Sequence, residues 1–285
     1  VNPQVRGNAA QALGKLGEAA RPALPALEQA SRDAEDEVRV AALAALGEVG
    51  GLGSGAARVL LGALEDANPL VRAAAVAAVG KRAELGEAAG AALLRAADDA
   101  NDQVKVEVAL ALPRRAGPTP EVIAALTRLL EDEDAGVQAH AAQALGSLGR
   151  AALPAGARLL HLAQAGAAAV RQQALRALVQ IQPPEAGAAF LAGLRDADPE
   201  VRKLAATGLI KAGQVAPEAV PVLVEALRDP EVPVRASAAR ALAGLDELPA
   251  EAVEPLVECL ADSDDRVRVG GALALTRFLS SFLYG

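Results

Sequence analysis

Apolar positions recur along this chain with one nearly constant period. A valine followed by a basic or polar residue, most often arginine, opens a helical pattern nine times, and successive valines lie 33 residues apart except at one 31-residue step. The valines are Val5, Val38, Val71, Val104, Val137, Val170, Val201, Val234 and Val267. A constant period of this length indicates a solenoid built from short structural repeats.

Each period contains two helical patterns. Counting from the valine as position 0, positions +4, +7, +8 and +11 are mostly apolar and fall on one side of a helix with 3.6 residues per turn. Position +5 is apolar throughout, which predicts that this helix packs against both its own repeat and the next one. Leucine, or once Phe190, recurs at position −11. We therefore predict that each repeat consists of a helix A, a turn, and a helix B that contains the valine.

The turn before helix B carries a helix start signal. An Asx-Pro pair precedes the valine at Asn2-Pro3, Asn68-Pro69 and Asp198-Pro199. A short polar N-cap followed by proline at the first helical position is typical of a helix start. Asp134 and Asp264 hold the same place without the proline, and we predict that they cap in the same way.

Charges also gather at these turns. The acidic runs 131–134 and 262–265 lack the glycine and terminal glutamate of an EF-hand loop, so we interpret them as helix caps rather than as calcium sites. The basic residue at position +1 lies one turn beyond the cap. We predict that these basic residues form a ladder of contacts with aspartates within or between repeats.

The motif at these turns resembles a known family. Residues 2–14, NPQVRGNAAQALG, and 68–80, NPLVRAAAVAAVG, are similar to the short HEAT-like repeats of the phycobilin-lyase type, and the resemblance covers essentially the whole chain. It implies an all-α fold: a right-handed α-solenoid of about nine helical hairpins, with helix B on the concave face and helix A on the convex face. Such repeats serve many unrelated binding roles, so the resemblance is specific for fold and not for function.

The domain prediction is one continuous solenoid over 1–285, irregular between 113 and 190. Pro113 should end or kink its helix B, residues 163–169 lack the acidic turn, and residues 180–185 form a shorter connection. Pro22 and Pro25 should distort or delay the start of the first helix A.

The chain opens at the cap of a helix B, without methionine, and no helix A precedes it. We therefore expect a segment of a longer protein in which Val5, Ala9 and Leu13 are poorly covered. The apolar stretch 278–285 has two interpretations: it covers the open end of its own solenoid, or it contacts a partner, a downstream domain or a second copy.

Composition narrows the functional classes. The chain is 52% hydrophobic and 1% aromatic with net charge −8, which argues against indiscriminate binding of nucleic acid by the whole surface. There is no uninterrupted apolar segment of transmembrane length and no visible signal peptide. A single cysteine excludes an internal disulfide and is compatible with the predicted cytoplasmic location.

Residues with catalytic chemistry are few. His140 and His161 should project from opposite faces, so a shared metal ion is not expected. Cys259 falls at a position otherwise filled mostly by alanine and is interpreted as a core residue. No phosphate-binding loop or nucleophile motif is present. We predict no enzyme activity, no cofactor and no metal.

The positions that the motif leaves unspecified, +2, +3, +6 and +10 of helix B, are the candidate binding surface. Early repeats place small apolar groups there, including Ala41 and Ala73; later repeats place basic residues and no acidic ones. The candidate partner-binding residues are Val40, Ala44, Val106, His140, Gln143, Gln172, Gln173, Arg176, Lys203, Thr207, Lys211, Arg240 and Arg277.

Two functional classes follow from this surface, beside the simpler interpretation of a solvated polar face. The first is a non-enzymatic scaffold that binds a protein or peptide on the concave helix-B face. The alternative is nucleic-acid or polyanion binding through the basic track of the C-terminal repeats. The resemblance alone adds a third, a subunit of a bilin lyase.

Overall fold

The computed structural model describes residues 2–51, 53–212, 219–245 and 248–284, and helices and short connections make up these segments. The chain divides into two compact units, Val1–Leu148 and Gly149–Gly285, called here the N-terminal unit and the C-terminal unit. The prediction of an all-α fold is confirmed. No helix in the described segments is long and apolar enough to cross a membrane.

In the N-terminal unit, helices of the B type alternate with helices of the A type. The B helices are α1 Pro3–Leu16, α3 Asp36–Glu48, α5 Pro69–Lys81, α7 Asp102–Arg115 and α9 Ala135–Ser147. The A helices are α2 Leu24–Ala30, α4 Ser54–Gly62, α6 Gly86–Ala96 and α8 Pro120–Leu129. Short 3₁₀ helices occupy η1 Gly17–Ala23, η2 Ala63–Glu65 and η3 Ala83–Leu85.

The C-terminal unit repeats this alternation. Its B helices are α11 Ala168–Ile181, α13 Pro199–Ala212, α15 Val232–Leu242 and α17 Asp265–Tyr284. Its A helices are α10 Gly156–Ala165, α12 Ala186–Gly193, α14 Val220–Ala226 and α16 Ala250–Cys259, and the 3₁₀ helix η4 Gly149–Ala155 precedes them.

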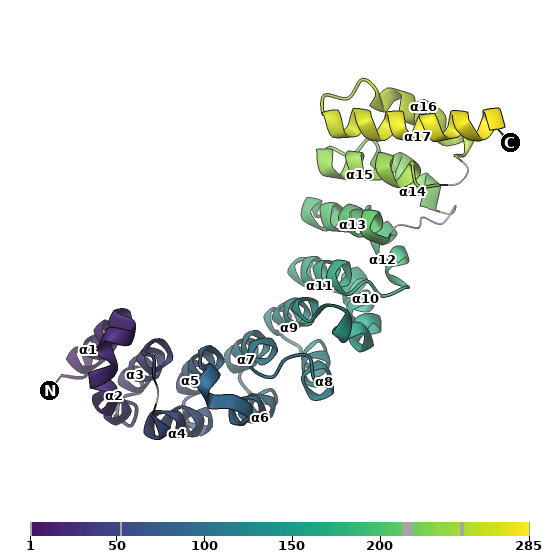
Figure 1. The fold of residues 1–285 in the computed structure, drawn as a ribbon. Coiled ribbons are helices and arrows are strands. Elements are labelled where there is room, and N and C mark those ends of the chain that lie inside the picture. The colour runs from purple at the N-terminus through teal and green to yellow at the C-terminus, as the bar shows by residue number, and fades with distance from the viewer. Residues whose placement is uncertain (1, 52, 213–218, 246–247, 285) are drawn as a thin grey trace. The chain divides into compact units, whose positions relative to one another are not determined.

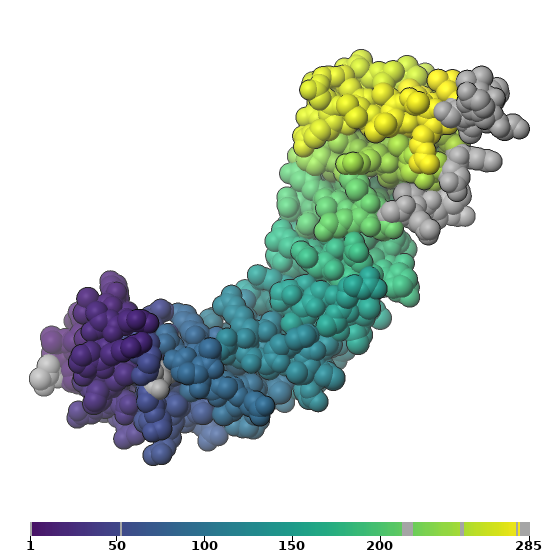
Figure 2. All heavy atoms as spheres, in the orientation of Figure 1, coloured from purple at the N-terminus to yellow at the C-terminus, as the bar shows by residue number. Residues whose placement is uncertain are grey.

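Within each unit the B helices form one layer and the A helices a second (Figure 1). Inside a unit, each B helix packs on the next B helix of that unit, as in α1 on α3 or α15 on α17, and each A helix packs on the B helix that follows it. On the face seen in the space-filling view, atoms of neighbouring helices are in contact throughout each unit (Figure 2). The predicted sequence of helix A, turn and helix B is confirmed.

The core follows the predicted register. The repeat valines from Val38 to Val267 are 0–1% exposed, and the residues at position −11, from Leu27 to Leu256, are 0–2% exposed. Val5 is 57% exposed, because no described helix A covers that side of α1. The expectation that Val5 and Ala9 are poorly covered is confirmed, and Leu13 is half-buried.

Polar side chains start the B helices as predicted. The Asn2 Oδ1 atom accepts from the Gln4 N–H at 2.9 Å, and Asp198 Oδ1 accepts from the Glu200 N–H at 2.8 Å. Such bonds satisfy amide groups that have no partner inside the helix. Asn68, Asp134 and Asp264 cap in the same way.

An arginine–aspartate ladder joins successive turns, as predicted. The Nε and Nη2 atoms of Arg72 donate to the Asp99 carboxylate at 2.7 and 2.8 Å, and its Nη1 donates to the Asp66 carbonyl at 2.9 Å. Each such residue therefore ties its own turn to the next. The other rungs are Arg6–Asp33, Arg39–Asp66, Lys105–Asp132, Arg171–Asp196, Arg202–Asp229 and Arg235–Asp262.

The ladder keeps its carboxylates ionised. The hydrogen bond from Arg6 lowers the pKa of Asp33 from 3.8 to about 2, and the hydrogen bond from Arg235 does the same for Asp262. Burial is the largest single influence on Asp196 and would raise its pKa, but the hydrogen bonds from Arg171 and the Asp198 N–H, together with the nearby arginine charges, lower the pKa overall. The acidic runs thus serve caps and rungs.

The predicted irregularities appear with one correction. Residues 17–23 form a 3₁₀ helix and α2 starts only at Leu24, as Pro22 and Pro25 suggested. The start of α11 has no side-chain cap, in keeping with the missing acidic turn. The prediction at Pro113 is too strict: α7 runs through it to Arg115. Proline is tolerated there because it lies in the last turn, where little helix remains to be disrupted.

One irregularity is a matched pair. Phe190 of α12 takes the place of the usual leucine and is 2% exposed. A Cβ atom on Gly208 of α13 would lie only 2.4 Å from the Phe190 ring. The phenylalanine ring therefore fits because the facing residue of α13 is a glycine, which has no side chain.

Candidate functional site

The B-helix surface, defined by positions +2, +3, +6 and +10 of the B helices, is mainly solvent-accessible. Every candidate residue predicted there is partly or fully exposed. Two positions assigned to this surface are wrong: Ala41 and Ala73 are 4% and 7% exposed. Neighbouring B helices approach so closely in the N-terminal unit that these small side chains are covered; a Cβ on Gly14 would meet the Ala45 Cα at 3.0 Å.

A shallow hollow of about 520 Å³ lies between α1 and α3. Ala44 contributes to it, and Lys15 and Glu48 bring opposite charges to its edge. Glu48 also pairs with Lys81. This hollow therefore has small apolar walls and no preference for one sign of charge. Val40 and Val106 are half-buried and do not line it.

The candidate polar residues in the middle of the chain are engaged locally. The His140 Nδ1 atom lies 2.7 Å from the Gly136 carbonyl, which holds the ring against its own helix. Gln172 Nε2 donates to Asp198 at 2.9 Å. The Oε1 atom of Gln173 is buried and finds no hydrogen-bond partner among the described residues, while Gln143 is exposed.

The basic track is flanked by carboxylates of the turns. Lys203 Nζ lies 3.1 Å from Glu231 and 3.9 Å from Glu200, and Arg176 Nη2 lies 3.9 Å from Glu200. Positions +2, +3, +6 and +10 hold no acidic residue in these repeats, as the sequence indicates. Glutamates outside those positions reach the track in three dimensions.

Three other candidate residues have different surroundings. Thr207 is exposed and donates its hydroxyl to the Lys203 carbonyl, one turn earlier in its own helix, at 2.9 Å. Arg277 donates to the Ala243 carbonyl at 2.7 Å, beside the end of α15, where a positive charge is favoured by the helix dipole. Arg240 is exposed and has no carboxylate within ion-pair distance among the described residues.

A groove of about 400 Å³ brings Arg240 together with exposed apolar side chains. We call it the C-terminal groove, and its apolar residues Ile210, Val269 and Leu273 are 37%, 56% and 52% exposed. The remaining lining residues are Pro233, Ala236, Ser237, Asp265, Arg266 and Gly270. Sequence reasoning missed the three apolar residues, although Val269 and Leu273 occupy positions +2 and +6, and Ile210 stands where glycine is common.

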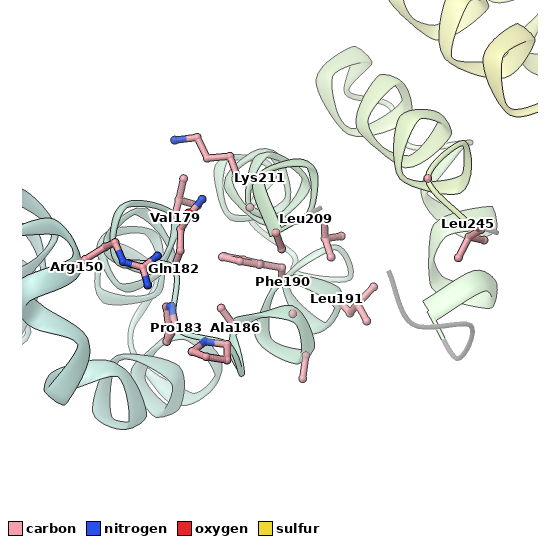
Figure 3. A pocket seen from close by; sticks show the side chains of 16 residues that line it. Arg150, Val179, Gln182, Pro183, Ala186, Phe190, Leu191, Leu209, Lys211 and Leu245 are labelled. Atoms are coloured by element: carbon pink, nitrogen blue, oxygen red, sulfur yellow. The ribbon is translucent and has the colours of Figure 1, made fainter. Parts of the chain in front are cut away.

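A larger hollow of about 910 Å³ in the C-terminal unit surrounds Phe190. Arg150 and Gln182 lie on one side of the ring and Leu209 on another, while the Lys211 ammonium group points away from the ring (Figure 3). The lining residues Ala212 and Leu245 are followed directly by residues 213–218 and 246–247, which lie outside the described residues. We assign no ligand to this hollow.

The titratable residues considered for chemistry are separate from the C-terminal groove. Cys259 is 5% exposed, as expected of a core residue, and burial raises the pKa of its thiol. His161 is exposed on α10. Within the described part of the chain, no group of three or more His, Cys, Asp and Glu residues is placed to hold a metal ion. The side chains of the apolar stretch 278–285, except Leu279, lie outside the described residues.

Comparison with known proteins agrees with this geometry. The profile described as HEAT repeats matches residues 23–113, 90–178, 156–243 and 187–276, and the profile described as the PBS lyase HEAT-like repeat matches residues 5–33. No curated protein matches the chain.

Two solved structures are similar over most of the chain. An engineered protein is 25% identical with a TM-score of 0.64, over 98% of this chain and 86% of its own. The Escherichia coli protein YibA is 19% identical with a TM-score of 0.67, over 95% of this chain and 96% of its own. The second likeness concerns the fold alone.

Proposed function

Because this chain belongs to the HEAT-repeat family, we propose that it is a scaffold that binds a segment of a partner protein on its B-helix surface. Solenoids use extended surfaces of this kind for recognition. The role proposed is non-enzymatic, and it uses the concave helix-B face that the family resemblance implies.

The observation that carries the proposal is the contrast between the turns and the B-helix surface. At the turns, the charged residues of the motif form helix caps and the ion pairs of the arginine–aspartate ladder. The B helices, by contrast, carry hollows and large apolar side chains, such as Val269 and Leu273, that the other described residues leave exposed. Exposed apolar surface next to polar rims is typical of protein interaction sites.

The alternative, binding of a polyanion, is supported less. Of the three basic residues at the centre of the predicted track, Arg176 and Lys203 lie beside Glu200 and Glu231. Arg240 has no such neighbour within the described segments. A phosphate backbone would meet these glutamates as well as the cations. Polyanion binding would fall steeply with salt, which a titration with duplex and single-stranded nucleic acid measures.

Selection from a random dodecapeptide display library against the immobilised chain tests the scaffold proposal. We expect soluble copies of the selected peptides to bind the parent chain and to be weakened at least about tenfold by Ala44→Glu, His140→Glu or Arg240→Glu, because these changes place a charge on or reverse a charge of the B-helix surface.

Matched changes on A helices are the controls. Ala124→Glu on α8 and Arg58→Glu on α4 alter exposed residues of the same types and should leave binding unchanged. Peptides that are insensitive to all three B-helix changes, or lost only with the A-helix changes, would sink the proposal. Circular dichroism and urea unfolding verify that each variant is folded.

A further inference from the structure

The C-terminal groove combines an apolar lining with Arg240, a cation that has no carboxylate partner in the part of the chain that the structure describes. We propose that it binds a segment of a partner protein in which apolar side chains are adjacent to a carboxylate. This inference rests on the proposed scaffold function and names the chemistry of the partner and the place where it binds.

The walls of the groove come from two helices that flank a third. Ile210 lies near the end of α13, Val269 and Leu273 lie one turn apart on α17, and α15 packs between these helices (Figure 1). Two residues four apart on a helix form one continuous apolar strip. Large apolar side chains that are exposed next to one another are typical of interaction sites, because burying them against a partner is favourable.

The floor of the groove is made of small groups. Ala236 contributes a methyl group, and Gly270 contributes no side chain. A Cβ on Gly270 would lie 2.9 Å from the Ala239 Cβ, so α17 approaches α15 closely at this point. The space between the walls is therefore left for side chains from outside, and its volume of about 400 Å³ lies within the range of binding sites in proteins.

The charges at the rim select the sign of the partner. Asp265 pairs with Arg268, and Arg266 pairs with Asp264 at 3.0 Å. Arg240 remains without a carboxylate among the described residues, and it is exposed beside the apolar lining. The chain as a whole carries net charge −8, so this local positive charge departs from the overall balance. A carboxylate next to Arg240 would gain a charge-assisted hydrogen bond.

Apolar walls distinguish this partner from nucleic acid. A phosphate backbone would satisfy Arg240 but would leave Ile210, Val269 and Leu273 uncovered. A purely apolar segment would cover the walls and place nothing beside the arginine. A segment with both features fits the whole groove, and complementary charge also fixes the direction in which it binds.

The peptides selected from the dodecapeptide library are the probes for this inference, synthesised with a fluorophore and measured by anisotropy. We expect them to be enriched in Leu, Ile or Phe together with Asp or Glu. Leu273→Ser and Arg240→Glu should each weaken binding at least about tenfold. Replacing the acidic residues of a peptide with lysine should weaken binding to the parent and restore binding to Arg240→Glu.

Two variants outside the groove serve as matched controls. Val257 of α16 is 52% exposed and does not line the groove, so Val257→Ser removes a comparable apolar side chain elsewhere. Arg58→Glu reverses an exposed arginine on α4. Neither change should alter affinity by more than about twofold, within the range of ordinary surface substitutions.

The outcomes separate this inference from the proposed function. The groove inference is wrong if the selected peptides are basic. It is also wrong if Ala44→Glu or His140→Glu abolishes their binding while Leu273→Ser and Arg240→Glu leave it unchanged. Both outcomes are compatible with the scaffold function. Peptides insensitive to every change on the B-helix surface overturn both. Self-association in sedimentation that is abolished by Leu273→Ser, with no peptide selected, assigns the groove to a second copy and also overturns the inference.

Discussion

The two units use the same repeat but bring their B helices together differently. In the helices α1, α3 and α5 of the N-terminal unit, glycine at position +9 faces alanine of the next B helix: Cβ atoms built on Gly47 and Gly80 would lie 3.1 and 2.9 Å from Ala78 and Ala111. In the C-terminal unit, position +9 holds Val179, Ile210, Ala243 and Thr276. There, the B helices α15 and α17 approach closely at Gly270, which faces Ala239, while Gly208 of α13 faces Phe190 of the A helix α12.

This difference shows how one motif supports two kinds of surface. Where the N-terminal B helices α1 and α3 meet, small residues leave a shallow surface around Ala44. In the C-terminal unit, the larger residue Ile210 occupies position +9 of α13. It is 37% exposed and lies at the edge of the C-terminal groove. The core residues are equivalent in both units, so position +9 varies the surface while the repeat is kept.

The largest effect is expected from exchanging the residue types at position +9. Gly47→Ile would force a branched side chain against the backbone of Ala78. Even the Cβ atom of such a side chain would lie only 3.1 Å from the Ala78 Cα atom. We expect a loss of about 3 kcal/mol or more in the free energy of unfolding, measured by urea unfolding followed by circular dichroism.

The reverse change is the control for this comparison. Ile210→Gly removes a partly exposed side chain and adds a helical glycine, which together cost about 1–2 kcal/mol. If Gly47→Ile costs no more than Ile210→Gly, the close approach at position +9 does not distinguish the two units.

A smaller effect is expected at the matched pair in the C-terminal unit. Gly208→Ala gains helix propensity of about 1 kcal/mol, but its methyl group would lie 2.4 Å from the Phe190 ring. Overpacking outweighs the gain, and we expect a net loss of about 1–2 kcal/mol in urea unfolding.

The double variant Phe190→Leu with Gly208→Ala restores the residues usual at these positions. It should be more stable than either single variant, with a coupling energy of about 1 kcal/mol or more. Additive effects of the two changes would contradict the direct contact between ring and glycine. Gly187→Ala on α12 is a suitable control, since a Cβ there meets nothing within 4 Å.

The smallest effect is expected for one rung of the ladder, which both units share. The pKa of Asp262 is lowered from 3.8 to about 2, so its ionised form stabilises the fold at pH values above 3.8. That stabilisation is lost as the pH falls through about 2, where the folded protein takes up the proton. Asp262→Asn should cost about 1 kcal/mol at pH 7, after allowance for screening of a partly exposed pair.

The difference between Asp262→Asn and the parent chain should disappear between pH 4 and pH 2 in urea unfolding. Asp33→Asn is the matched change in the N-terminal unit, because the pKa of Asp33 is also about 2. Both variants should converge with the parent over the same window. A variant whose deficit persists unchanged at pH 2 would show that its carboxylate acts through shape rather than charge.

Most of the fold was accessible from the sequence. Val201, Leu223 and their equivalents are buried where the period places them, and Asn68 and Asp198 start helices as their type suggests. The ladder was predicted too, because Arg202 and its equivalents recur one turn beyond an acidic cap. Repetition makes these inferences secure, since every repeat tests the same position again.

The candidate site was less accessible. Ala41 and Ala73 were placed on the surface but are covered, because the distance between neighbouring B helices is not encoded in the period of either helix. The sequence places no acidic residue at the surface positions around Lys203, but Glu231 reaches it from the following turn at 3.1 Å. The C-terminal groove is not evident from the sequence because Ile210 and Leu273 lie 63 residues apart and meet only when α13, α15 and α17 pack.

The sequence by itself determined the repeat, the two helices in each repeat, their caps and the identity of the core, because these depend on local periodicity and on neighbours within one turn or one period. Only the tertiary structure decided which surface positions stay open and which charges stay unopposed. The physical reason is that these properties depend on how closely adjacent helices approach, which is set by pairs such as Gly47 with Ala78 or Phe190 with Gly208.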